Sequence, residues 1–155
     1  MDAQTLINHI DSIELTYEAT PLMAWEIGAA DNVDDVAQFM WKGGPIPPQA
    51  SVKRPGRIKL SEEDPRLEKR YWDFVKKEMF LFLCENDPKY KELWDRIGKL
   101  ENKSTSALVL VISGYIGEKA GVEGSLLAGF VAVCLYGAVK ISKEALCQHL
   151  KSKNA

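Results

Sequence analysis

Residues that build metal sites and disulfide scaffolds are scarce in this sequence. Its 155 residues include three cysteines and two histidines. The cysteines, Cys84, Cys134 and Cys147, are an odd number and form no C-x-x-C pair, which disfavours both a disulfide framework and a structural zinc site. We therefore expect reduced thiols in a cytoplasmic protein, with neither a metal nor another cofactor.

Motifs for catalysis and for phosphate binding are missing as well. The chain contains no G-x-x-x-x-G-K-[ST], G-x-G-x-x-G, G-x-S-x-G or H-E-x-x-H pattern. Asp31, Asp34 and Asp35 cluster just before a helical pattern, where helix capping explains them better than magnesium binding. An enzyme whose site follows no recognised pattern stays open as an alternative.

Positive charge is missing from the first 41 residues, although the net charge of the whole chain is only −2. Residues 1–42 contain eight acids and one base, whereas residues 43–60 contain four bases and no acid. Because proteins that bind duplex DNA usually carry a basic excess, nucleic acid is disfavoured as a partner. The first twenty residues also lack the basic start and the unbroken apolar core of a secretory signal.

No uncharged run is long enough for an ordinary membrane span. The two longest, residues 104–117 and 124–139, have fourteen and sixteen residues, and a bilayer crossing takes about 20. We interpret them as the buried helices of a C-terminal apolar hairpin, within residues 104–150. Its second run carries Ser125, Gly129 and Gly137, small residues that we expect to let helices pack closely. Membrane insertion of the hairpin is the alternative.

Apolar residues recur at helical spacing outside the hairpin too. Leu6, Ile10 and Ile13 follow this spacing in the first segment. A longer helix is expected from Ser61 onward, with apolar residues on one face and residues 76–78 on the other. Because no strand-rich pattern appears, we predict an all-α fold. The prediction is one domain, residues 1–155, built as a compact bundle of about five to seven helices.

One long connection interrupts the helical pattern. Residues 43–60 read GGPIPPQASVKRPGRIKL, and their three glycines and four prolines exclude a regular element. Connections of this length are usually functional or disordered. Trp72 lies beside Tyr71, off the main stripe of its helix. We predict it as a partly exposed interface anchor, with burial in a wide apolar stripe of a packed bundle as the equal alternative. The predicted partner-binding residues are Lys53, Arg54, Arg57, Lys59 and Trp72.

These features favour a small non-enzymatic protein–protein interaction component, such as an adaptor, an inhibitor or immunity-type protein, or an accessory subunit. It would bind through the basic loop and an apolar or aromatic helix face, and self-association is a further possibility. A small membrane-active protein that inserts residues 104–139 is one alternative. An enzyme with an unrecognised site is the other.

Overall fold

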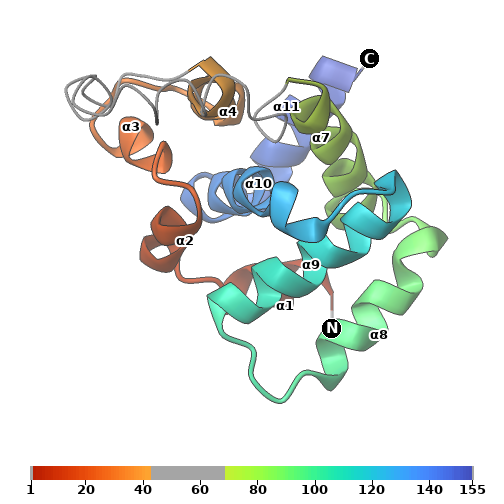
Figure 1. Cartoon of the computed structure of the whole chain (residues 1–155). Helices are drawn as coiled ribbons and strands as arrows, with labels where there is room; N and C mark the ends of the chain where they lie inside the picture. Colours follow the sequence, from red (N-terminus) through yellow and green to blue (C-terminus); the bar gives the residue numbers. More distant parts are fainter. Residues whose placement is uncertain (1, 43–68, 155) are drawn as a thin grey trace, which may run out of the picture.

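The computed structural model describes residues 2–42 and 69–154, with side chains described as far as Lys151. These residues form nine α-helices and two 3-10 helices and contain no strand (Figure 1). The predicted all-α fold class is confirmed. The count for the described residues exceeds the five to seven helices expected, because residues 2–42 alone form four short ones. The basic loop and the predicted helix start at Ser61 lie outside the described residues.

Helices α1 to α4 are short, and acidic side chains start the first two. They span Ala3–His9, Ser12–Glu18, Leu22–Glu26 and Val33–Lys42. Asp2 and Asp11 accept hydrogen bonds from the backbone N–H groups of Thr5 and Ile13. Such caps satisfy amide groups that have no partner inside the helix. Helices of five to ten residues are marginal in isolation, so packing must hold these four in place.

Helix α7 (Lys69–Leu83) buries apolar residues of the expected stripe, Val75, Phe82 and Leu83, and buries more of its surface than expected. Trp72 and Met79 are fully buried, and Lys76 and Glu78, which the sequence pattern assigned to the solvent side, are 9% and 3% exposed. Both charged groups have partners, which makes their burial possible. After α7 the chain forms a 3-10 helix, η2 (Pro88–Tyr90), and α8 (Lys91–Lys99).

Helix α10 (Ala128–Lys140) is the centre of the fold. Nine of its thirteen residues are buried, and it contacts α1, α2, α4, α7, α9 (Thr105–Ala120) and α11 (Lys143–Asn154). Figure 1 shows α10 in the middle of the molecule, with α2 and α3 to one side and α7 and α11 to the other. No helix in residues 2–42 or 69–154 is long and apolar enough to cross a membrane.

The turn between α9 and α10 holds the closest backbone contacts at glycines. A Cβ atom on Gly117 would lie 2.7 Å from the Val122 carbonyl oxygen, and one on Gly124 would lie 2.6 Å from Cα of Gly114. Gly121 caps α9 with a φ of 73°, a left-handed conformation that favours glycine. Beyond α10 the chain breaks at Ile141 and Ser142, so residues 128–154 form two helices.

The three small residues predicted to pack helices together have other surroundings. Ser125 is exposed and lies in the 3-10 helix η3 (Gly124–Leu126), before α10 begins, so that prediction is wrong for Ser125. A Cβ on Gly129 or on Gly137 would first meet side chains, the Cε methyl of Met40 and Cγ1 of Val33. Gly137 therefore makes room for side chains, whereas a Cβ on Gly129 would also lie 3.6 Å from the Glu18 backbone carbonyl oxygen in α2.

A disulfide bond joins Cys84, directly after α7, to Cys147 in α11. The expectation of three reduced thiols is therefore wrong, and Cys134 is the free cysteine, buried inside α10. The two bonded residues are 63 positions apart, so their spacing carried no signal. The packing of α11 against α7 brings them together.

Candidate functional site

Large apolar side chains that remain exposed gather around α2 and α3. Ile13 and Tyr17 are 68% and 80% exposed and lie one turn apart on α2. Met23 in α3 and Ile27 directly after it repeat the same spacing, at 53% and 75%. Because α2 and α3 pack against each other, the two pairs lie on neighbouring short helices. We call these four residues the α2–α3 surface.

Two other large apolar residues in the described part of the chain are exposed, Leu110 in α9 and Ile141 directly after α10. Leu110 lies one turn after Ser106, whose hydroxyl donates to a carboxylate oxygen of Glu18 at 3.3 Å. Ile141 follows Lys140, which forms an ion pair with Glu26 at 3.2 Å. Leu110 therefore lies near α2, whereas Ile141 lines a pocket with Gln4, Ile7 and Asn8 of α1.

The local packing explains why these side chains stay outside. Helix α2 contacts α10, and Leu15 and Ala19 are its buried apolar positions. Ile13 and Tyr17 fall on the opposite side of the seven-residue helix. In α3 the buried positions are Leu22 and Ala24. Each short helix thus has apolar residues on two sides. The core covers one side, and the other side remains exposed.

Acidic groups border this apolar surface. Glu14 and Glu26 are exposed, Glu18 is partly exposed, and Asp11 and Asp31 stand at the two ends of the α2–α3 segment. From Asp2 to Trp41 the sequence contains no lysine or arginine. The cation that pairs with this border among the described residues comes from α10, in the Lys140–Glu26 ion pair.

Trp72, predicted as an exposed anchor, is 1% exposed, so the expectation of an exposed side chain is wrong. Its indole N–H donates to Oδ1 of Asp34 at 2.9 Å, and Nζ of Lys76 donates to the same oxygen at 2.9 Å. Nε2 of His149 lies 2.6 Å from Oδ2 of Asp34. The indole also packs against Phe130 in α10. Trp72 therefore belongs to a polar junction of α4, α7 and α11 and has almost no surface to offer a partner.

Asp34 is the acceptor that holds this junction together. Partial burial alone raises the pKa of its carboxyl group, but the hydrogen bonds from Lys76, Trp72 and His149 outweigh it and bring the pKa below the usual value. Asp34 stays ionised at neutral pH and fixes three helices with one side chain. Helix capping was expected around Asp31, Asp34 and Asp35, and it is found at Asn32, whose Oδ1 accepts a hydrogen bond from the backbone N–H of Asp35 at 3.0 Å.

Glu78, in the second half of α7, is a buried carboxylate. It accepts the hydroxyl proton of Tyr90 in a hydrogen bond and pairs with Nζ of Lys89 at 2.7 Å. The Tyr115 hydroxyl donates to the backbone carbonyl of Lys89 at 2.9 Å. Burial, followed by the neighbouring carboxylate, raises the pKa of Tyr90, so this group stays a neutral donor. The arrangement is a structural brace between α7, η2 and α9.

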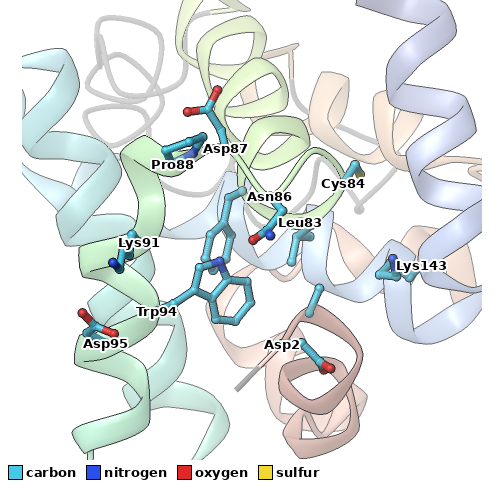
Figure 2. Close-up of a pocket in the computed structure, with 12 residues that line it drawn as sticks. Asp2, Leu83, Cys84, Asn86, Asp87, Pro88, Lys91, Trp94, Asp95 and Lys143 are labelled. Carbon is cyan, nitrogen blue, oxygen red and sulfur yellow. The ribbon is translucent and has the colours of Figure 1, made fainter.

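A cavity of about 610 Å³ lies between α1, α7, α8 and α11 (Figure 2). Trp94 forms its floor, stacked on Phe82 with 4.4 Å between ring centroids. The indole N–H of Trp94 is buried and without a hydrogen-bond partner. Figure 2 shows the carboxylates of Asp87 and Asp95 turned away from Trp94. With the N–H covered and these charges outside, the cavity defines no particular ligand.

The remaining predicted site residues are Lys53, Arg54, Arg57 and Lys59, which lie outside the described residues. Trp72 is thus the one predicted partner-binding residue within the described part of the chain, and it is buried. Sequence reasoning missed the α2–α3 surface because it assigned Ile13 to a buried stripe. A usable signal was present: Ile13 and Tyr17 recur at i, i+4 on a different side from Leu15. Comparison with protein-family models, curated proteins and solved structures finds no match to the chain.

Proposed function

We propose that this protein is a small interaction component that binds a partner protein through the α2–α3 surface. The observation that carries the proposal is that four of the six exposed large apolar side chains described lie in or directly after two adjacent short helices. Single exposed apolar residues are ordinary, but contiguous ones commonly mark a contact site. Tyrosine and large aliphatic side chains supply contact area at a low cost in conformational entropy.

The interaction class fits the rest of the molecule as well. The partly buried carboxylate of Asp34 and the buried carboxylate of Glu78 are each engaged by several donors, which suits a rigid framework for a binding surface. The α2–α3 surface takes the place that Trp72 held in the sequence-based hypothesis. The basic loop remains a second candidate contact, as predicted from its four cations.

A site-specific photocrosslinking experiment tests the proposal. A photoreactive phenylalanine derivative replaces Tyr17 in one variant and Glu144, an exposed residue in the first turn of α11, in the control. In cells of the source organism, crosslinked adducts of defined mass are expected from position 17 and not from position 144. Identical adduct patterns, or none from position 17, would refute an interaction surface on α2 and α3.

A further inference from the structure

We infer that the α2–α3 surface binds a cationic amphipathic helix, a partner segment with apolar residues on one face and lysine or arginine beside them. This inference rests on the proposed function and adds the chemistry of the partner. Two independent properties of the surface carry it, its charge and the spacing of its apolar residues.

The charge of the surface indicates the sign of the charge that its partner carries. Glu14, Glu18 and Glu26 lie beside Ile13, Tyr17 and Ile27 in sequence and are exposed or partly exposed. Glu18 accepts a hydrogen bond from the neutral Ser106 hydroxyl, and Glu26 forms an ion pair with Lys140. Glu14 has no hydrogen bond or ion pair among the described residues. An approaching cation would meet acidic groups on both helices, and complementary charge speeds encounter and rejects like-charged surfaces.

Spacing gives the shape of the partner. The exposed pairs Ile13–Tyr17 and Met23–Ile27 each span one helical turn. An amphipathic helix presents its own apolar residues at i, i+3, i+4 and i+7, so successive turns of such a helix match successive apolar pairs. Cationic side chains that border the helix's apolar stripe would then stand opposite Glu14 and Glu26.

The acidic border argues against two other occupants. A second copy of the same surface would bring carboxylates against carboxylates, which costs free energy when they are desolvated. A membrane with anionic lipids would repel the surface for the same reason. Both occupants are distinguishable from a cationic helix by direct measurement.

The experiment uses three synthetic fluorescent peptides of about 18 residues, or about five helical turns. The first combines leucine on one helical face with lysine on the other, the second scrambles the same composition, and the third replaces every lysine with glutamate. Fluorescence anisotropy with the full-length protein measures binding. We expect the first peptide to bind at least about tenfold more tightly than the other two, with an affinity that falls as salt rises.

Matched variants locate the contact. Ile13→Ser with Tyr17→Ser should weaken binding of the cationic peptide by about tenfold, the usual size of a hot-spot loss. Glu14→Lys should weaken it by several-fold, whereas Glu144→Lys should leave it unchanged. The two glutamates form a close control pair, since both are exposed and lie in the first turn of a helix. Circular dichroism and thermal unfolding confirm that each variant is folded.

The outcomes separate the inference from the proposed function. Equal binding of the anionic or scrambled peptide, or equal loss from both glutamate variants, overturns the cationic-helix inference. If no peptide binds, the cationic-helix inference is also overturned. In that case, photocrosslinked adducts from position 17 would still support an interaction surface for a different partner. Binding to vesicles of anionic lipid that is lost in the Ile13→Ser, Tyr17→Ser variant would make the occupant a membrane. A concentration-dependent dimer lost in that variant would make it a second copy.

Discussion

Two glycines in α9, three residues apart, should respond to the same substitution in opposite directions. A Cβ on Gly114 would meet nothing within 4 Å, whereas one on Gly117 would lie 2.7 Å from the Val122 carbonyl oxygen and 2.9 Å from the Gly124 nitrogen. The obstructing atoms at Gly117 are all backbone. They belong to the turn that leads into α10, so they cannot rotate away.

The magnitudes follow from two opposing effects. Alanine in a helix interior is about 0.8–1.0 kcal/mol more favourable than glycine, so Gly114→Ala should raise the free energy of unfolding by about that amount. Gly117→Ala gains the same propensity but is opposed by overpacking of about 1–3 kcal/mol. The propensity cancels in the comparison, which leaves a difference of about 1–3 kcal/mol between the two variants.

Urea denaturation and calorimetry with the disulfide intact measure this difference. For a chain of this length each kcal/mol shifts the melting temperature by roughly 2–4 °C. Gly117→Ala should therefore melt roughly 2–12 °C below Gly114→Ala. If Gly117→Ala proved as stable as Gly114→Ala, the close contact between α9 and the turn before α10 would not exist as described.

Three further outcomes are expected. Because folding lowers the pKa of Asp34, its carboxylate stabilises the fold above pH 3.8, the ordinary pKa, and this stabilisation disappears as the pH falls through the folded-state pKa. The difference in unfolding free energy between wild type and Asp34→Asn, measured by urea denaturation, should therefore become smaller at acid pH. A difference that does not change with pH would contradict the junction. The double variant Cys84→Ser, Cys147→Ser removes the disulfide, which closes a loop of 63 residues. Its unfolding free energy should be lower by about 4 kcal/mol. An unchanged melting temperature would show that the bond does not form. Burial raises the pKa of the Cys134 thiol, so a maleimide should label it only after unfolding; rapid labelling of the native protein would place it at the surface.

Local sequence patterns were enough to predict the helical class and the apolar centre. Ser104 caps α9 through the N–H of Ala107, as a serine before an apolar run suggests. The uncharged run 124–139 became α10, whose burial on all sides matches its uniform apolarity. These features depend on residues within one or two turns of each other, so a sequence can display them.

Long-range pairings were not predictable in the same way. Asp34 joins Trp72, Lys76 and His149 across 38, 42 and 115 positions, and the orientation of α7 follows from that junction. Lys76 and Glu78 were expected to face solvent because their partners, Asp34 for Lys76 and Tyr90 and Lys89 for Glu78, lie on other helices. The candidate surface was missed for a related reason: periodicity shows which residues share a side, but only the packed fold shows which side is covered.

The central position of α10 also determines the order in which the helices can pack during synthesis. Helices α1 to α4 contain five to ten residues each and are too short to persist alone in water. Their apolar residues pack against a helix that begins only at Ala128. While the ribosome is still producing the middle of the chain, α1, α2 and α4 lack the surface of α10 against which they pack. The apolar and acidic residues of α2 and α3 are therefore accessible to other molecules before the fold exists, and become an ordered surface when α10 has emerged.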